Sequence, residues 1–211
     1  MTTLLHVIAS PNGASSRSTE VALELVGAYR ERQAHATIET VDVWDLDLPA
    51  FDAQMIAAKF AVLRGQQATD EQRAVWARAV ALAQAFNRAD LYVFSLPMWN
   101  FGLPYRLKHY IDVITLPGQN WSWTRGDGYA SLLRDKRAVL VYSSANDFAP
   151  SPGMDAPADD FQKPFMRRWL RFIGIDVVDE IDVSPTLSDP DTLAAAISDG
   201  RAKARMIASA V

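Results

Sequence analysis

The chain contains no cysteine among its 211 residues. Disulfide bonds, zinc–thiolate sites, iron–sulfur clusters and thiol nucleophiles are therefore excluded. Histidine is scarce as well, because the chain has only three, His6, His35 and His109. They are too few and too scattered to indicate a cluster of metal ligands, so we expect no metal.

A large excess of charge of one sign is also lacking. The formal net charge is −4 and the isoelectric point is near 5.4, whereas a nucleic-acid-binding surface is usually basic. No apolar run reaches the length needed to cross a membrane. Because the first apolar run already begins near Thr3, we expect no leader peptide and a cytoplasmic protein, with neither nucleic acid nor membrane as a partner.

Internal repeats, low-complexity tracts and linkers are absent too, so we expect one domain over residues 1–211. What is present is an alternation of short apolar runs with segments of helical periodicity. Strands are predicted at residues 4–9, 37–43, 90–95, 138–143 and 175–183, and helices at 18–33, 53–87, 104–114, 159–173 and 189–210. The helical segment at 53–87 is expected to break near Gly65, with Thr69 or Asp70 capping its second part. Residues 118–128, rich in Trp and Gly, predict an excursion or a small hairpin.

Five strands interleaved with helices predict an α/β protein with a doubly wound parallel sheet and helices on both faces. In the strand order 2-1-3-4-5, the direction of winding switches between strands one and three. Ligands of such sheets bind at this switch, outside the carboxyl ends of the strands. The loops after strands one, three and four all flank this place.

The first of these loops, residues 10–19, carries five hydroxyl groups and one arginine at the start of a helix. Helix N-terminal amides with Ser and Thr hydroxyls suit a phosphate dianion. The loop has neither the Gly-x-Gly-x-x-Gly pattern nor the Gly-Lys-Ser/Thr of a P-loop, so one terminal phosphate fits it better than a pyrophosphate. A plainer interpretation stays open, in which Ser16 or Ser18 only caps the helix.

The second loop, residues 97–104, reads Pro-Met-Trp-Asn-Phe-Gly-Leu-Pro and follows the third strand. Its prolines lack amide donors, so we expect the sheet to end here. The Asn100 amide suits the edge of a heterocycle. Its neighbours Met98, Trp99 and Phe101 offer surface for a flat ring. An aromatic turn that only covers the core is the alternative.

The third loop, residues 143–150, follows the fourth strand. Ser144 and the amides of Asn146 and Asp147 suit the polar edge of a heterocycle, although an ordinary surface loop has the same composition. Taken together, the three loops describe a phosphate cradle, an aromatic shelf and a polar clamp. Flavin mononucleotide (FMN) has the matching parts, namely one phosphate and one large flat ring with a polar rim.

Residues 97–112, Pro-Met-Trp-Asn-Phe-Gly-Leu-Pro-Tyr-x-Leu-Lys-x-Tyr-Ile-Asp, resemble the signature of the FMN-dependent NADH azoreductases, also called FMN-dependent NADH:quinone oxidoreductases. Residues 10–18 resemble the phosphate loop of that family, and the resemblance extends over about residues 3–208. It implies a flavodoxin-like three-layer sandwich. In that family a tyrosine commonly stands at the place of Trp99, and Arg-Gly-Gly at residues 145–147.

The resemblance also implies bound FMN, NADH or NADPH as hydride donor, and quinones or aromatic azo compounds as acceptors of two electrons in a ping-pong cycle. It implies a homodimer with its sites at the subunit interface. The residues expected to bind FMN are Ser10, Ser16, Arg17, Ser18, Pro97, Met98, Trp99, Asn100, Phe101, Ser144, Ala145, Asn146 and Asp147. An apolar substrate slot over the ring is expected from Trp121, Trp123, Phe148, Phe161 and Phe165, beside Trp99 and Phe101, with core packing as the alternative for each. No catalytic side chain is expected, because the flavin carries the hydride chemistry.

Two other functions are compatible with the sequence. The first is a one-electron carrier of the flavodoxin type, which is usually more acidic around the ring and needs no aromatic substrate slot. The second is a module without enzymatic activity, in which the same loops bind a regulatory ligand or a partner protein.

Overall fold

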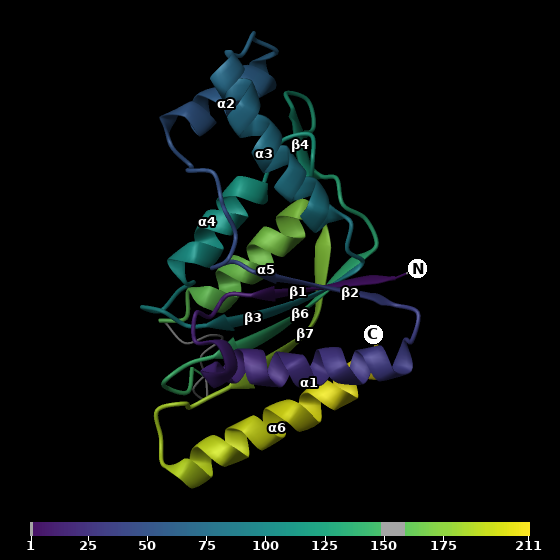
Figure 1. The fold of residues 1–211 in the computed structure, drawn as a ribbon, viewed down its shortest axis with the longest axis vertical. Helices are drawn as coiled ribbons and strands as arrows, with labels where there is room; N and C mark the ends of the chain where they lie inside the picture. Colours follow the sequence, from purple (N-terminus) through teal and green to yellow (C-terminus); the bar gives the residue numbers. More distant parts are fainter. Residues whose placement is uncertain (1, 149–158) are drawn as a thin grey trace.

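The computed structural model describes residues 2–148 and 159–211. Within them, a five-stranded parallel sheet has the order β2-β1-β3-β6-β7, which confirms the predicted order because β6 and β7 are its fourth and fifth strands in the chain (Figure 1). The strands are β1 Thr3–Ile8, β2 Thr37–Asp42, β3 Leu91–Pro97, β6 Lys136–Ser143 and β7 Ile175–Val183. The helices are α1 Arg17–Arg32, α2 Ala53–Arg64, α3 Asp70–Asn87, α4 Tyr105–Ile114, α5 Gln162–Ile173 and α6 Pro190–Ala208. Helices α1 and α6 cover one face of the sheet and α4 and α5 the other, with α2 and α3 extending beyond them (Figure 1).

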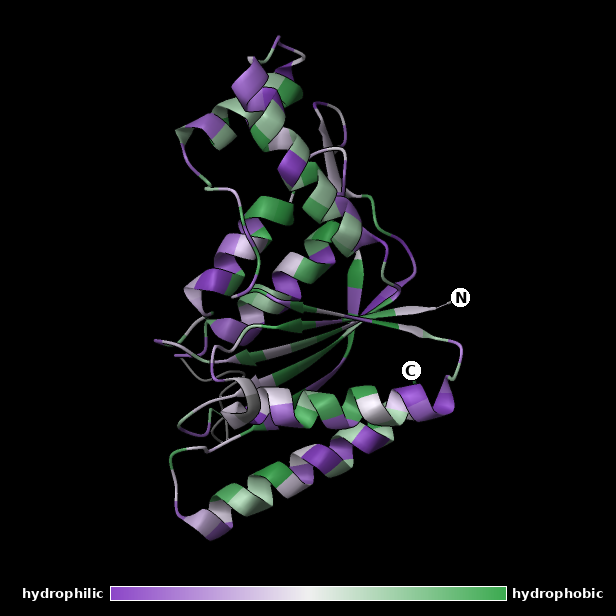
Figure 2. Cartoon of the chain, in the orientation of Figure 1, coloured by the Kyte–Doolittle hydropathy of each residue, from purple (hydrophilic) through white to green (hydrophobic). Residues whose placement is uncertain are grey.

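The central strands are buried on both faces, as expected for a parallel sheet between helical layers. Successive residues of a strand point to opposite faces. Leu4 of β1 therefore packs in the core under α1 and α6, whereas Leu5 and Val7 pack in the core under α4 and α5. Figure 2 shows green, apolar stretches along the central strands.

The predicted break in the long helical segment is confirmed. Helix α2 ends at Gly65, whose φ of 62° is the left-handed conformation that glycine adopts without steric cost. Thr69 then begins α3 with a capping box, in which its hydroxyl accepts from the amide of Gln72 and the Gln72 side chain accepts from the amide of Thr69.

The predicted end of the third strand is wrong by two residues, because β3 continues past Ser95 and pairs Pro97 with Ser143. The amide of Met98 donates to Ser143 O at 2.7 Å, toward β6. The neighbouring Pro97 nitrogen therefore faces the other side, where the last bond to β1 is already made by Ala9 N to Ser95 O. A proline at the end of a strand loses no ladder bond in this position.

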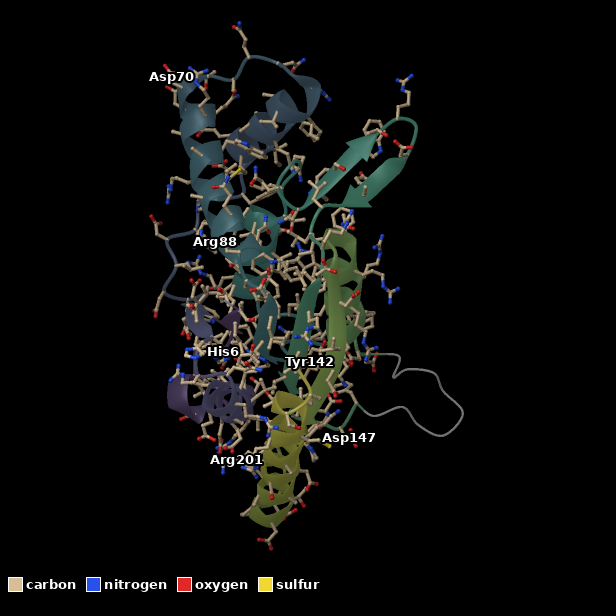
Figure 3. The ribbon with its side chains drawn as sticks, turned by 90° about the vertical axis from the view of Figure 1, so that its right-hand side faces the viewer. His6, Asp70, Arg88, Tyr142, Asp147 and Arg201 are labelled. Carbon is tan, nitrogen blue, oxygen red and sulfur yellow. The ribbon has the colours of Figure 1, made fainter. Side chains whose placement is uncertain are left out.

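Residues 118–128 lead into a hairpin of β4 (Trp121–Thr124) and β5 (Gly128–Ser131), which confirms the small-hairpin prediction. The hairpin stands away from the main sheet (Figure 3). In the part of the chain that the structure describes, no helix is both long and apolar enough to cross a membrane.

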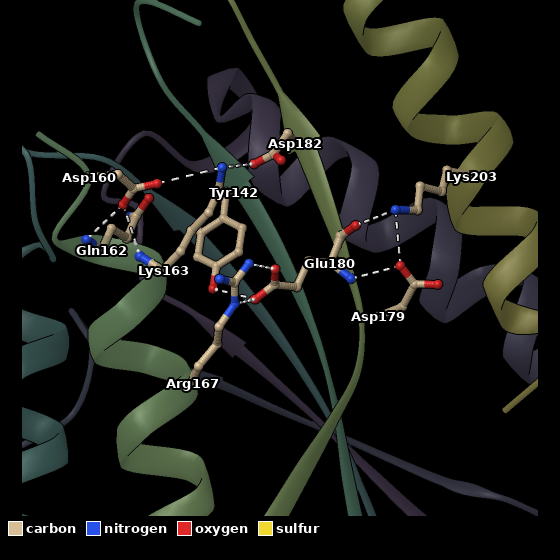
Figure 4. A network of polar contacts seen from close by, with 9 residues as sticks. All are labelled: Tyr142, Asp160, Gln162, Lys163, Arg167, Asp179, Glu180, Asp182 and Lys203. Carbon is tan, nitrogen blue, oxygen red and sulfur yellow. Dashed lines mark hydrogen bonds and ion pairs between the residues drawn. The ribbon is translucent and has the colours of Figure 1, made fainter. Parts of the chain in front are cut away.

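A network of ion pairs holds α5 and α6 to the outer strand β7 (Figure 4). Arg167 of α5 pairs with Glu180, and Lys203 of α6 pairs with Asp179 at 3.0 Å. Lys203 Nζ also donates to the carbonyl oxygen of Glu180 at 2.5 Å. At the start of α5, the Gln162 side chain donates to Pro97 O at 2.8 Å, which fixes this helix against the end of β3.

Candidate functional site

The three loops singled out from the sequence line one cavity of about 270 Å³ at the carboxyl edge of the sheet. Its lining residues are Ser10, Asn12, Ser15, Ser16, Arg17, Pro97, Met98, Ser143, Ser144, Ala145 and Thr186. These side chains include no carboxylate, and Arg17, which pairs with Glu20 at 3.0 Å, is their only cation, so hydroxyl groups and helix amides are what suit the cavity to an anion. The position matches the switch of the strand order, where the topology predicts a ligand.

The phosphate-type part of the cavity is built at the N-terminus of α1. Ser16 is the N-cap, and its Oγ accepts from the amide of Thr19 at 3.3 Å. The capping interpretation is therefore correct for Ser16, which lines the cavity at the same time. Helix geometry leaves the amides of Arg17 and Ser18 without a partner inside the helix, so they remain donors for an anion. Ser10 and Ser18 are both buried beside this end.

The loop after β3 is a tight turn at residues 99–102. Trp99 and Gly102 exchange two backbone hydrogen bonds of 3.0 and 2.9 Å, and the two residues between them have positive φ, 46° at Asn100 and 67° at Phe101. Asn tolerates this conformation, whereas Phe adopts it only under strain. The amide of Phe161 donates to Phe101 O at 3.0 Å and holds the turn in place. The turn presents Phe101 to solvent, with 51% of it exposed.

This strain predicts that Phe101→Gly is more stable than Phe101→Ala by about 1 kcal/mol. Both variants remove the same exposed ring, so their difference reports the backbone alone. Urea unfolding of the two proteins measures it. An alanine variant as stable as the glycine variant would contradict the strain.

The aromatic shelf contains a residue that the sequence did not single out. Trp44 lies 5.8 Å from Trp99 and 5.3 Å from Tyr105, measured between ring centroids. Its indole donates to Ala9 O at 3.0 Å, which joins the shelf to the end of β1. The sequence did offer one signal for Trp44. It follows the second strand directly, and that strand lies beside the first strand in the predicted order, so Trp44 is expected near the end of β1.

The loop after β6 is held by the segment that follows β7, a second contribution that the sequence did not reveal. Thr186 donates to Ser144 O through both its amide and its hydroxyl, at 2.9 and 3.0 Å. The Ser144 hydroxyl donates to Asn146 O at 2.7 Å, so it closes the loop on itself. Asn146 and Asp147 are exposed, and the last two loop residues of the prediction, 149 and 150, lie outside the described residues.

Within one chain, the residues predicted to form the aromatic substrate slot lie in separate places. Trp121 and Phe165 line a second cavity of about 660 Å³ between α2, α4, α5 and the hairpin. Phe161 instead adjoins the turn at Phe101, and Trp123 is exposed on the hairpin. Phe148 lies at the end of the third loop and lines neither cavity. The reason is topological: α4 leads the chain from the ligand edge back to the opposite end of the sheet, where the hairpin begins.

His6 of β1 is fully buried behind the cradle, in the interior of the molecule (Figure 3). Its Nε2 lies 3.0 Å from Ser95 Oγ, and its Nδ1 has no hydrogen-bond partner among the described residues. Burial disfavours the charged imidazolium and lowers the pKa of His6 from 6.5 to about 4.

This burial predicts a loss of about 2 kcal/mol of unfolding free energy between pH 7 and pH 5. In that range the unfolded chain binds more protons than the folded one, because the pKa of His6 is about 4 when folded and 6.5 when exposed. Stability therefore decreases as pH falls. Denaturant unfolding at both pH values measures the loss, and His6→Leu should remove it. An equal slope in the variant would refute the assignment to His6.

The fold and the position of the cavity define a flavodoxin-like protein, and the family model described as flavodoxin-like fold matches residues 2–207. Among curated relatives, the FMN-dependent NADH:quinone oxidoreductase 3 of Pseudomonas fluorescens is 41% identical over 191 residues, 90% of this chain and 88% of the relative. The FMN-dependent NADH:quinone oxidoreductase 2 of Pseudomonas syringae pv. tomato is 38% identical over 210 residues, 99% and 98% of the two chains. The chain belongs to this family of oxidoreductases, as its sequence resemblance indicated.

Solved structures agree with this assignment. An azoreductase from Bacillus anthracis str. Sterne has a TM-score of 0.89 at 23% identity, with both chains covered completely, which shows the shared fold. An FMN-dependent NADH-azoreductase from Bacillus anthracis str. Ames Ancestor, solved in complex with FMN, has a TM-score of 0.83 at 26% identity over 99% of this chain and 100% of that one.

Proposed function

We propose that the protein binds FMN and uses it to reduce quinones and aromatic azo compounds by two electrons, with NADH or NADPH as the donor, in a ping-pong cycle. The single observation that carries the proposal is the cavity shared by the loops after β1, β3 and β6. The names of the relatives give the reaction class.

The cradle at the start of α1 has the chemistry of a phosphate site. Ser10, Ser16 and Ser18 supply hydroxyl groups and the first turn of α1 supplies amides, while Arg17, which pairs with Glu20 at 3.0 Å, lies at the rim. The cavity of about 270 Å³ has room for the phosphate and the chain that joins it to the ring. The ring itself is then placed outside, over the exposed aromatic turn.

The turn after β3 supplies the flat surface for that ring. Trp99, braced by Trp44, and the strained Phe101 form this surface, with Met98 and Pro97 at its base. The Asn100 amide is assigned to the polar rim of the ring. Because the Ser144 hydroxyl is already bonded to Asn146 O, the clamp of residues 144–147 acts through its main chain and not through that hydroxyl.

When bound, FMN would supply the redox chemistry: it would take a hydride from the nicotinamide and give two electrons to the acceptor. The residues of this chain bind and orient it, and leave one open side over the turn for donor and acceptor in succession. Phe161 adjoins this side and is 63% exposed, which suits contact with a flat substrate.

We further propose that the protein is a cytoplasmic single-domain homodimer. The second cavity is flanked by large exposed apolar side chains, including Phe60 and Leu63 of α2 and Tyr129 of the hairpin. Such a surface is typical of an interface. If a second copy packed on this face, aromatic residues that lie apart in one chain would come close together at a shared site.

The colour and redox response of the purified protein test the proposal. We expect a yellow protein, or one that becomes yellow on reconstitution with FMN, which NADH bleaches and a quinone re-oxidises. A colourless protein that does not bind added FMN would refute it. Stable one-electron reduction in a redox titration would instead support a carrier of the flavodoxin type.

A further inference from the structure

We infer that the second cavity is a binding site for an aromatic anion, that is, a carboxylate or sulfonate carried on a flat ring. The cavity joins aromatic walls to cations that lack a carboxylate partner and to a buried N–H group that lacks an acceptor among the described residues. The inference goes beyond the proposed function, because within one chain this cavity is separate from the cradle at the start of α1.

The walls of the second cavity suit a flat ring. Half of the residues that line it are aromatic. Three of them, Trp121, Tyr129 and Phe172, pack against one another with ring centroids 5.5, 5.7 and 5.8 Å apart. The volume of about 660 Å³ lies within the range of roughly 300–1,000 Å³ that small-molecule sites occupy. A molecule of one or two fused rings therefore fits this space.

The charges around the cavity are unbalanced. Its lining includes three cations, Lys59 of α2, Lys108 of α4 and Arg168 of α5, and one carboxylate, Asp112. Lys108 already holds that carboxylate, since its Nζ donates to both oxygens of Asp112 at 2.6 and 2.7 Å. Neither Lys59 nor Arg168 forms an ion pair with a carboxylate of the described residues. Two positive charges of the cavity are therefore left for a ligand.

Lys59 is the more confined of these two cations. Its Nζ lies over the rings of Phe51 and Trp121, 5.9 and 5.7 Å from their centroids, and the Arg168 guanidinium lies 5.9 Å from the centroid of Phe172. Such contacts attract a cation to a ring face but leave its N–H donors unused. Burial lowers the pKa of Lys59. An anion in the cavity would offset this cost, because opposite charges attract more strongly in a partly buried site than in water.

Trp121 supplies a further donor without a partner. It is only 6% exposed and lines the cavity, and its Nε1 has no hydrogen-bond partner among the described residues. The indole nitrogen can only donate. A buried donor without an acceptor is costly, so the acceptor has to come from a water molecule or a ligand.

Together these groups define the class of the ligand. Two cations and one N–H group require an acceptor with negative charge, whereas a cationic ligand would find only the carboxylate that Lys108 already holds. The aromatic walls require a flat apolar body. A carboxylate or sulfonate on an aromatic ring combines both properties. If the second copy proposed above packs on this face, the bound anion would lie between the two copies.

Naphthalene-2-sulfonate and the neutral naphthalene-2-sulfonamide test the inference, because they share the ring system and differ in charge. We expect the sulfonate to bind about tenfold more tightly, and Lys59→Gln and Arg168→Gln each to reduce this preference about threefold. The double variant should bind both probes about equally. A titration of the purified protein followed by nitrogen-15 NMR of the indole N–H groups gives the affinities. The resonance of Trp121, assigned with Trp121→Phe, should shift when the sulfonate binds, and that of Trp44 should not.

Arg30→Gln is the matched control, since it removes one positive charge from α1 on the opposite face of the sheet (Figure 1). Its preference for the sulfonate should equal that of the wild type. Lys59 is half-buried and Arg168 is exposed, so the variants at both positions should keep the thermal midpoint of the wild type. Equal binding of the two probes by the wild type, an unchanged preference in the double variant, or a shift confined to Trp44 would overturn the inference.

The outcome for this cavity is distinguishable from the outcome for the proposed function. A protein that binds the sulfonate beside Trp121 but does not bind FMN would refute the proposed function and support the inference. A yellow protein that NADH bleaches, but that binds both probes equally, would do the reverse.

Discussion

Replacing Gly174 with alanine is expected to lower the free energy of unfolding by about 4 kcal/mol. Gly174 ends α5 with a φ of 94°, where a side chain is strained. An added Cβ would also lie 2.3 Å from the backbone oxygen of Leu133. Because that atom belongs to the main chain, relief requires a shift of the segment that connects the hairpin to β6. Urea unfolding measures the loss.

Gly27→Ala is the matched control for this substitution. Gly27 lies in the middle of α1, exposed, with no atom within 4 Å of an added Cβ. There alanine should raise stability by about 0.5–1 kcal/mol, since it favours the helix over the unfolded chain. If the two substitutions change the free energy of unfolding equally, the close approach to Leu133 is not what makes alanine unfavourable at Gly174.

Ser16→Asp is expected to weaken FMN binding about 1,000-fold while leaving α1 intact. Aspartate caps a helix as well as serine does, so the fold keeps its bond to the Thr19 amide. A carboxylate about 4 Å from a phosphate, however, costs about 4 kcal/mol per pair of unit charges at the effective dielectric constant of a protein surface. The cavity that Ser16 lines has room for the added atoms.

Riboflavin supplies the control. It lacks the phosphate of FMN, so its uncharged chain end is not repelled by the new carboxylate. Its affinity should change much less than that of FMN, and the thermal midpoint of the apoprotein should stay close to that of the wild type. If Ser16→Asp binds FMN and riboflavin with equally reduced affinity, the phosphate is not held at the start of α1.

Much of the fold was predictable from the sequence because its signals are local. The parallel, doubly wound sheet followed from apolar runs alternating with helical periodicity, and the break between α2 and α3 followed from Gly65 and Thr69, whose effects act within one turn. The end of β3 was not predictable, since a proline is tolerated there only because β1 stops earlier.

The position of the cavity was predictable where loops follow strands directly, as at Ser16 and Met98, which line it. It was not predictable where the chain returns from a distance. Thr186 reaches the cavity from beyond β7, and the buried His6 faces it only through Ser95 and Thr19. The position of Trp121 beside the second cavity was not predictable either, because the sequence shows how many aromatics are present but not the end of the sheet at which they lie.

The ion pairs along β7 have a consequence for how copies of this protein can associate. An outer strand usually exposes backbone groups that recruit a strand from another molecule. Here Lys203 occupies the carbonyl of Glu180, and Arg167 and Lys163 hold the carboxylates of Glu180 and Asp182. One backbone acceptor of this edge is thus already used and charged side chains flank it, which disfavours the addition of a strand from another molecule here.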